Sequence, residues 1–308
     1  KKNFFNYAVE YIKLTEPKTI ITFNDNLIWF YKIKIVLPKI NVVSFQNGFR
    51  NKFFFENLKK YEPLCSDIIF VFNDKIGSQF KKYIKTKTVT LGSVKNNFKK
   101  KNTYKKKRKS ILLVSGGHPE GRKYFASNEK NGFKFKSSEF YGPDAELFKN
   151  LLTYCKINKF ELEVASKNAL DKNEFKFFKN LAKKNNFIYH KNTYKNMITY
   201  DISNQVLATV SSHSTFGPEN LARGNRTAIF NNKKKPTNGI FDVFWFLNVK
   251  KKGSFWSDDV SLIEIKRVLG FVLNSNDLIW RKKTSNIIKN LMKYDSKNER
   301  LFKTFKNL

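Results

Sequence analysis

The sequence predicts an α/β protein built of two units, each a parallel sheet covered by helices, which face each other across a cleft. Apolar runs alternate with helical segments in the first third of the chain, and the alternation starts again after a basic stretch without apolar periodicity. Such alternation is typical of parallel sheets covered on both faces, and the basic stretch indicates a linker. One long doubly wound sheet is the alternative arrangement.

Four apolar runs predict the strands of the first unit. They are 19–23, 42–45, 68–72 and 88–91, and segments 26–36 and 75–84 between them suit helices. We expect this unit to cover residues 1–97. The chain starts at Lys1, without Met and inside a helical pattern, so the expectation that residues of the first unit are missing before Lys1 stays open.

The second alternation predicts a unit over 110–275, after a basic linker at 98–109. Its expected strands are 111–115, 161–165, 187–189, 206–210 and 227–230, and its expected helices lie near 144–156 and 172–184. Helical patterns near 258–273 and 276–293 close the chain, so we assign 276–308 to C-terminal helices. Ligands of paired units of this kind bind in the crevice at the carboxyl ends of the strands.

Composition favours a globular, soluble and cytoplasmic protein. The chain is 41% hydrophobic and 28% charged. No apolar run reaches the roughly 18 residues of a membrane span, and no signal peptide opens the chain. Cys65 and Cys155 lie far apart without CxxC or Cys/His spacing, which suggests neither a disulfide framework nor a zinc site.

The formal net charge of +35 predicts attraction to anions such as nucleic acid, acidic lipid surfaces or phosphorylated small molecules. The chain is also rich in Lys, Asn, Ile and Phe together, which is the signature of an AT-rich coding bias. Because the lysines are spread along the chain, we attribute most of the excess to this bias. Peripheral contact with an anionic inner-membrane surface stays open as a partner interaction.

A hydroxyl-rich turn follows an expected strand in the stretch VSSHSTFGPENLARGNRTAIFN (210–231). Pro218 suits the first position of a short helix. The N–H groups of that helix, with the hydroxyls of Ser214 and Thr215, would form a phosphate cradle. Glu219 on the first turn would accept hydrogen bonds from ribose hydroxyls. Plain helix capping by Ser and Thr is the alternative.

Polar side chains also follow two neighbouring strands of the first unit. Gln46 and Asn47 come just past 42–45, and Asp25 comes just past 19–23. Open α/β sheets keep their chemistry at the carboxyl ends of the strands, so these loops predict a site. Turn formation is the alternative for the Asn-Gly and Asp-Asn pairs.

A glycine-rich loop, SGGHPEGR (115–122), follows the first strand of the second unit. Its glycines, Gly116 among them, allow close backbone approach beside Ser115. His118 and Arg122 suit contact with a phosphate or a developing negative charge. No DxD pair is present, so we expect no metal site. The absence of GxxxxGK[ST] and GxGxxG argues against a P-loop NTPase and a dinucleotide enzyme.

In this order, the motifs resemble a family of bacterial surface carbohydrate biosynthesis proteins, sugar transferases with the GT-B architecture. The features that carry the resemblance are TFNDN with FY at 30–31, QNGFR at 46–50, LGSVKNN at 91–97, STFGPENLARGN at 214–225 and KGSFW at 252–256. The loop VSGGHPEG departs from the pattern. It looks like the His-Pro motif of bacterial sialyl- and Kdo-transferases, which use CMP-sugars, although it sits at a different strand.

The resemblance implies a metal-independent transferase without a cofactor, whose co-substrate is a nucleotide-sugar donor such as a CMP-linked acidic sugar like Kdo. The second unit would hold the donor, and the first unit would hold the acceptor, a surface glycan or its lipid-linked precursor. With the glycine-rich loop included, donor contacts would come from Ser115, Gly116, Arg122, Ser214, Thr215, Gly217, Glu219 and Arg223.

The same resemblance assigns roles in the reaction. Asp25 would deprotonate the acceptor hydroxyl, and Gln46 and Asn47 would orient the sugar. Arg223 would either help to neutralise the leaving group or pair with Glu219. His118, from the glycine-rich loop, is the further catalytic candidate.

Two other functions stay open. A nucleotide-sugar 2-epimerase of the same fold would isomerise or hydrolyse its donor without an acceptor. A nucleic-acid-binding protein would interleave aromatic residues with Lys on one exposed element. The many Phe residues fall largely within apolar runs, so nucleic acid is not the expected partner.

Overall fold

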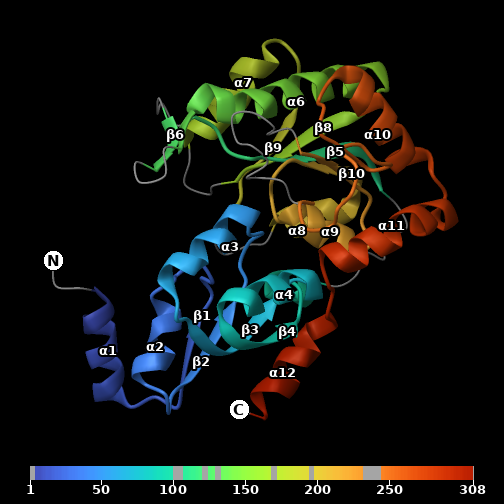
Figure 1. The fold of residues 1–308 in the computed structure, drawn as a ribbon. Coiled ribbons are helices and arrows are strands. Elements are labelled where there is room, and N and C mark those ends of the chain that lie inside the picture. The colour runs from blue at the N-terminus through green and yellow to red at the C-terminus, as the bar shows by residue number, and fades with distance from the viewer. Residues whose placement is uncertain are drawn as a thin grey trace. The chain divides into compact units, whose positions relative to one another are not determined.

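The computed structural model describes residues 4–99, 107–119, 124–128, 133–167, 172–193, 198–231 and 244–307. The chain divides into two compact units. Unit 1 comprises Lys1–Lys100 together with Lys289–Leu308, and unit 2 comprises Lys101–Ile288. Each unit has its own parallel sheet (Figure 1), which confirms the predicted fold class and excludes one long sheet.

Unit 1 contains a four-stranded parallel sheet in the order β1-β2-β3-β4. Its strands are β1 (Thr19–Thr22), β2 (Asn41–Phe45), β3 (Cys65–Val71) and β4 (Lys85–Thr90). All four lie where the apolar runs predicted them. Because Thr22 pairs with Ser44 and Phe45 pairs with Phe70, the loops after β1 and β2 leave the same edge of the sheet.

Helices cover both faces of this sheet. They are α1 (Phe4–Thr15), α2 (Phe30–Val36), α3 (Lys52–Leu58), α4 (Asp74–Tyr83), α5 (Val94–Phe98) and α12 (Glu299–Phe305), with 3-10 turns at Lys59–Tyr61 and Ser296–Asn298. On one face, Ile12 of α1 and Ile33 of α2 pack on Val42. On the other face, Phe305 of α12 stacks on Phe45 and Phe70.

The C-terminal segment is tied to unit 1 by backbone contacts. It enters unit 1 within α11 (Asp277–Leu291). The Asn73 amide donates to the Leu291 carbonyl at 2.9 Å, and Lys293 N donates to the Phe72 carbonyl at 2.9 Å. Gly92 has a φ of +80°, and a Cβ atom added there would lie 2.0 Å from the Lys293 carbonyl oxygen. Only glycine fits such an approach.

The LGSVKNN motif therefore has a structural role. Besides Gly92, its Asn97 side chain donates to the Asn298 side chain at 2.8 Å and accepts from Asp295 N at 3.0 Å. These contacts join α5 to the turn before α12. The sequence predicted helices over 276–308 without a partner, and the structure packs the part from 289 onward on the first sheet.

Unit 2 contains a six-stranded parallel sheet in the order β12-β11-β10-β5-β8-β9. The strands are β5 (Arg108–Val114), β8 (Glu161–Ala165), β9 (Ile188–His190), β10 (Val206–Ser211), β11 (Thr227–Phe230) and β12 (Trp256–Ser257). Among these six strands, β5 comes first in the chain, and it lies between β8, the second, and β10, the fourth. This is the doubly wound order, whose direction reverses between β5 and β10.

Two layers of helices cover the sheet of unit 2 (Figure 1). One layer holds α6 (Ser137–Ile157), α7 (Lys172–Ala182) and α10 (Leu262–Asn274), and the other holds α8 (Ile198–Gln205) and α9 (Phe216–Ala222). Beneath α8 and α9, Tyr200 and Phe216 pack on Leu112 and Val206. An antiparallel hairpin of β6 (Tyr124–Asn128) and β7 (Phe133–Lys136) precedes α6, and the sequence did not predict it.

The KGSFW motif forms a tight turn before β12. A Cβ atom added to Gly253 would lie 2.1 Å from the Trp256 ring, and the Trp256 indole N–H donates to the Lys250 carbonyl at 2.9 Å. The two aromatic side chains of this motif, Phe255 and Trp256, are buried, whereas Ser254 at its centre is partly exposed.

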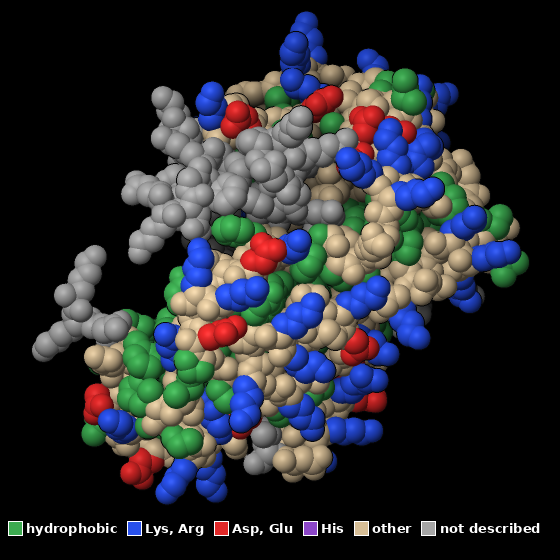
Figure 2. Space-filling model, viewed as in Figure 1, with side chains coloured by type: hydrophobic (Ala, Val, Ile, Leu, Met, Phe, Trp, Pro, Cys, Tyr) green, Lys and Arg blue, Asp and Glu red, His purple; other side chains and the backbone are tan. Residues whose placement is uncertain are grey.

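Basic side chains lie on the visible surface of both units and are not gathered on one element (Figure 2). This distribution agrees with a charge excess spread along the chain. Among the residues that the structure describes, no helix combines the length and apolarity needed to cross a bilayer. Residues 100–106 of the predicted linker lie outside the described part of the chain.

Candidate functional site

The strand-order reversal of unit 2 brings two predicted loops to one edge of the sheet. Val114, the last residue of β5, pairs with Ser211, the last residue of β10. The loops that follow begin at Ser115 and at Ser212. Doubly wound sheets bind ligands at this position, where the strand order reverses and two loops leave in opposite directions. We call the loops Ser115–His118 and Ser212–Thr215 the switch-point loops.

The first switch-point loop is shaped for close approach. The Ser115 hydroxyl accepts a hydrogen bond from Gly117 N at 3.0 Å, and Gly117 has a φ of +99°. A Cβ atom added to Gly116 would lie 2.6 Å from His213 Cε1 and 2.7 Å from Asp144 Oδ2. A side chain at position 116 would therefore displace both neighbours, and the two loops contact each other through this glycine.

His213 lies at the candidate site, in the second switch-point loop, and sequence reasoning did not select it because an isolated histidine is more often structural. Its Nδ1 lies 3.1 Å from the Ser212 hydroxyl and 4.0 Å from Asp144 Oδ2 of α6. Its ring meets the Phe140 ring edge to face at a centroid distance of 5.4 Å. The sequence feature that could have identified His213 is its position in the polar stretch SSHS (211–214), two residues after the last residue of β10.

The second switch-point loop leads into α9. Ser214 and Thr215 are partly exposed, and the Ser214 hydroxyl accepts from Phe216 N at 3.2 Å. Helix α9 begins at Phe216, two positions before the predicted Pro218. Gly217 is buried, and a Cβ atom added there would lie 2.9 Å from the Ser211 side chain. Gly217 therefore lets α9 pack closely on β10.

Glu219 of α9 and Arg223, the residue that follows this helix, are both buried, with exposed fractions of 7% and 1%. The Tyr200 hydroxyl donates to Glu219 at 2.6 Å, and burial, followed by the Glu219 charge, raises the pKa of Tyr200 well above its ordinary value. Arg223 donates to the Ser203 hydroxyl at 2.8 Å and to Asn220 at 2.6 Å, and lies over the Tyr200 ring. These hydrogen bonds join α9 to α8.

The other residues predicted in unit 2 are His118 and Arg122 of the glycine-rich loop. His118 is buried in the first switch-point loop, with its ring 6.2 Å from that of Phe177 on α7. Arg122 lies outside the described residues. Within the part of the chain that the structure describes, no group of three or more His, Cys, Asp or Glu side chains is arranged to hold a metal ion.

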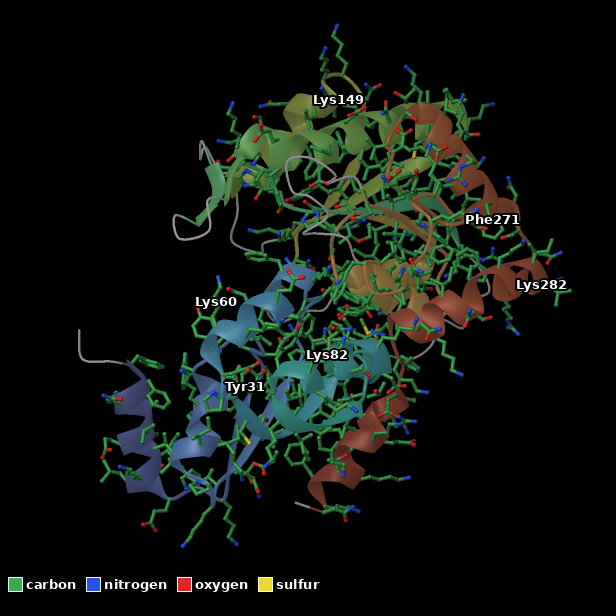
Figure 3. The ribbon with its side chains drawn as sticks, viewed as in Figure 1. Tyr31, Lys60, Lys82, Lys149, Phe271 and Lys282 are labelled. Carbon is green, nitrogen blue, oxygen red and sulfur yellow. The ribbon has the colours of Figure 1, made fainter. Side chains whose placement is uncertain are left out.

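The predicted residues of unit 1 form one cluster at the carboxyl ends of β1 and β2. Asp25 has no exposed surface. Its carboxylate accepts from Arg50 Nε at 2.8 Å, from a second Arg50 nitrogen, and from Asn47 N at 3.1 Å. Tyr31, shown in Figure 3, donates to the Asp25 carbonyl at 2.8 Å. The motifs TFNDN, FY at 30–31 and QNGFR therefore belong to a single hydrogen-bonded cluster.

Gln46 and Asn47 take different places in this cluster. The Gln46 side chain accepts from Phe72 N at 2.8 Å and donates to the Gly48 carbonyl at 2.9 Å, so it braces the loops after β2 and β3. Asn47 is exposed. Burial raises the pKa of the Asp25 carboxyl, and the Arg50 charge opposes the rise. A carboxylate without exposed surface does not reach a substrate hydroxyl in this conformation.

Two parallel-sheet units, the second of them doubly wound with glycine and hydroxyl residues at the reversal, define the GT-B fold. Residues 43–308 match the model of a family described as "putative O-antigen biosynthesis protein". The chain belongs to this family, which confirms the resemblance carried by its motifs. No protein with a curated function matches the chain.

Solved structures with the same fold include two UDP-GlcNAc 2-epimerases and Os79. A UDP-GlcNAc 2-epimerase from Methanocaldococcus jannaschii, in complex with UDP-GlcNAc and UDP, has a TM-score of 0.56 and 9% identity, over 99% of this chain and 80% of that chain. The UDP-GlcNAc 2-epimerase from Neisseria meningitidis, bound to UDP-GlcNAc, has a TM-score of 0.52 and 11% identity, over 99% and 80%. Os79 from O. sativa, in complex with U2F and trichothecene, has a TM-score of 0.51 and 10% identity, over 98% and 80%.

Proposed function

We propose that the protein is a glycosyltransferase that moves a sugar from a nucleotide-sugar donor to a bacterial surface glycan or its lipid-linked precursor. The observation that carries this proposal is the contact of Gly116 with His213 at the strand-order reversal of unit 2. Nucleotides bind at such reversals because backbone N–H groups and helix N-termini converge there. Membership of an O-antigen biosynthesis family supports a glycan product.

The donor would lie on the switch-point loops. The Ser115–Gly117 turn offers close backbone approach, and the partly exposed Ser214 and Thr215 offer hydroxyls to phosphate oxygens. We propose that Tyr200 orients the Glu219 carboxylate toward a ribose hydroxyl, since its own hydroxyl already holds one Glu219 oxygen. Arg223 would act through this network as a positioning residue, because its side chain is buried against α8.

On the acceptor side, we propose that Asp25 is a positioning residue. Its two carboxylate oxygens hold Arg50 and the Asn47 backbone, and its burial keeps it from the acceptor hydroxyl in this conformation. The exposed Asn47 would orient the acceptor sugar, and Gln46 would fix the loop that carries Asn47. His118 remains the candidate for stabilising charge on the departing phosphate.

Two donor classes are consistent with the site. The His118-Pro119 pair favours a CMP-linked acidic sugar such as Kdo, whereas the similar epimerase structures hold UDP-linked N-acetylglucosamine. We propose that either donor binds without a divalent metal. Backbone N–H groups and basic side chains would then stabilise the leaving phosphate.

Thermal shift and calorimetry with a panel of CMP, UDP, GDP and ADP, each with and without EDTA, test donor binding. A ligand that binds only the folded state raises the apparent stability of the protein. We expect one nucleotide to bind equally well in EDTA. Replacing Ser214 and Thr215 together by Ala should weaken that binding, while the same change at the exposed Thr153 of α6 should not.

The reaction products separate the remaining functions. With the nucleotide-sugar and a lipid-linked acceptor, transfer should produce a glycosylated acceptor and free nucleotide. An isomerised sugar on the nucleotide in the absence of acceptor would instead establish an epimerase. Binding of all nucleic acids tested, with no nucleotide bound, would overturn both enzyme functions.

A further inference from the structure

A lysine that no motif singled out lies along the first switch-point loop. Lys167 follows β8, and its Nζ donates to the Gly116 carbonyl at 2.9 Å. A Cβ atom added to Gly117 would lie 3.3 Å from Lys167 Cδ and 3.8 Å from its Nζ. The lysine stem therefore occupies the space beside a residue that must be glycine, because Gly117 has a positive φ.

The backbone of Lys167 is fixed from the opposite side. Its N–H donates to both carboxylate oxygens of Glu174, at 3.1 and 3.2 Å, and Glu174 is 1% exposed in the first turn of α7. The preceding residue is fixed as well, since Ser166 N donates to the His190 carbonyl at 2.9 Å and the Ser166 hydroxyl accepts from Asn192 N at 2.8 Å. Lys167 is thus held at both ends: its backbone N–H by the Glu174 carboxylate, and its ammonium group by the Gly116 carbonyl.

Among the residues that the structure describes, no carboxylate neutralises the charge of this ammonium group. Its contact is the neutral carbonyl of Gly116, and among the described residues no Asp or Glu side chain forms an ion pair with Lys167. An ammonium has three N–H donors, and the carbonyl uses one of them. Lys167 is exposed, so the other donors can meet an anion placed on the Gly116–Gly117 turn.

We propose that Lys167 binds a phosphate group of the nucleotide-sugar donor, with Glu174 as the residue that positions it. This inference rests on the proposed donor site. It adds an ammonium group to the backbone N–H groups, the hydroxyls and the His118 side chain of the switch-point loops. A lysine binds phosphate as a point charge, so it serves a monophosphate or a diphosphate donor alike.

The test compares Lys167→Met with Lys149→Met, since methionine keeps most of the apolar stem and removes the charge. Lys149 is an exposed lysine that projects from α6 (Figure 3). Calorimetric titrations would use UDP, CMP, the matching nucleosides uridine and cytidine, and inorganic pyrophosphate. Thermal unfolding of all variants confirms that each one is folded.

We expect Lys167→Met to weaken nucleotide binding by roughly 10- to 100-fold, as for a lost hydrogen bond to a charged group. Nucleoside binding should stay unchanged, Lys149→Met should bind like the wild type, and Lys167→Arg should recover part of the affinity. Wild-type affinity of Lys167→Met for the nucleotide would overturn this inference while leaving the donor site in place. An equal loss for nucleoside and nucleotide would also overturn it, because the effect would then be structural.

A wild-type protein that binds no nucleotide would refute the proposed function separately. In that case, pyrophosphate binding that Lys167→Met removes would still support an anion site at this lysine. Absence of both nucleotide and pyrophosphate binding would overturn the two proposals together.

Discussion

Arg50 donates a hydrogen bond to each carboxylate oxygen of Asp25, a side chain with no exposed surface. A bidentate guanidinium–carboxylate pair of this kind is strong and fixed in geometry. Removing one partner leaves the other charge buried without compensation. The pair therefore makes the QNGFR loop, which follows β2, depend on a carboxylate of the loop that follows β1.

Asp25→Asn should lower the free energy of unfolding by on the order of 3 kcal/mol, because the mostly buried Arg50 loses its counter-charge. Urea unfolding measures this loss, and the double variant Asp25→Asn with Arg50→Met should recover part of it. Asp277→Asn is the control, since Asp277 pairs with Arg226 at 2.8 Å but is 83% exposed. An Asp25→Asn protein of normal stability whose turnover falls by roughly 10²–10⁴ would restore Asp25 as the general base.

Glu219 and Tyr200 allow the ribose role to be separated from the structural one. Glu219→Ala should weaken donor binding by about 1–3 kcal/mol if the carboxylate holds the ribose, and it should also destabilise α9. Tyr200→Phe removes the 2.6 Å hydrogen bond that orients the carboxylate but keeps the carboxylate itself, so it should reduce stability and weaken donor binding less than Glu219→Ala does. Calorimetry with the donor nucleotide at a temperature where both variants are folded distinguishes the two effects. Tight nucleotide binding by Glu219→Ala would rule out the ribose contact.

We expect the protein to lose stability in acid as Glu163 of β8 becomes protonated. Burial opposes its ionisation, but hydrogen bonds from His190 and Ser110 and the charge of Arg108 hold its pKa below the ordinary 4.5. Because the folded-state pKa is the lower one, the unfolded chain takes up this proton first as the pH falls. The stabilisation is complete above 4.5 and is lost as the pH falls through the folded-state value.

The measurement is the free energy of unfolding of the wild type and of Glu163→Gln between about pH 7 and about pH 3.5. The wild type should be the more stable protein at neutral pH, and the difference should shrink at the acidic end. A difference that stays constant over the range would show that ionisation of Glu163 contributes nothing.

Gly92→Ala should detach the C-terminal segment, since its Cβ atom would lie 2.0 Å from the Lys293 carbonyl oxygen and φ is +80°. Hydrogen exchange should rise over 291–305 while unit 2 keeps its protection. Gly224→Ala is a matched control, because Gly224 has a φ of +91° but open space around its Cβ position. It should cost backbone strain alone. Equal exchange in both variants would show that the close approach at Lys293 is not essential.

The strands could be predicted from the sequence because they are short apolar runs buried on both faces. Segments such as 42–45 and 206–210 carry that signal without help from the rest of the chain. The β6–β7 hairpin was missed, because FKFK places Lys at alternate positions and its period extends over only four residues. Helix α6 begins at Ser137, earlier than predicted, and its start depends on the hydrogen bond from Lys136 N to the Glu139 carboxylate.

The loops of the candidate site could be predicted from the sequence, but their contacts could not. Polar residues after buried strands marked loops that the structure brings together, since parallel strands end at one edge of a sheet. Whether Asp25 and Arg223 face solvent or the interior depends on partners distant in the chain, Arg50 and Ser203. His213 and Lys167 were overlooked for the same reason. Both lie beside the backbone of Gly116, and the three residues come together only in the folded chain.

The return of the chain to unit 1 decides how the protein can be cut into fragments. A piece ending at residue 100 would contain all four strands of the first sheet but would lack Phe305, the ring that stacks on Phe45 and Phe70. Its Asn73 and Asn97 side chains would also lose Leu291 and Asn298 as hydrogen-bond partners. A fragment of unit 1 for expression therefore needs residues 289–308 joined to it, whereas unit 2 is a single uninterrupted stretch of the gene.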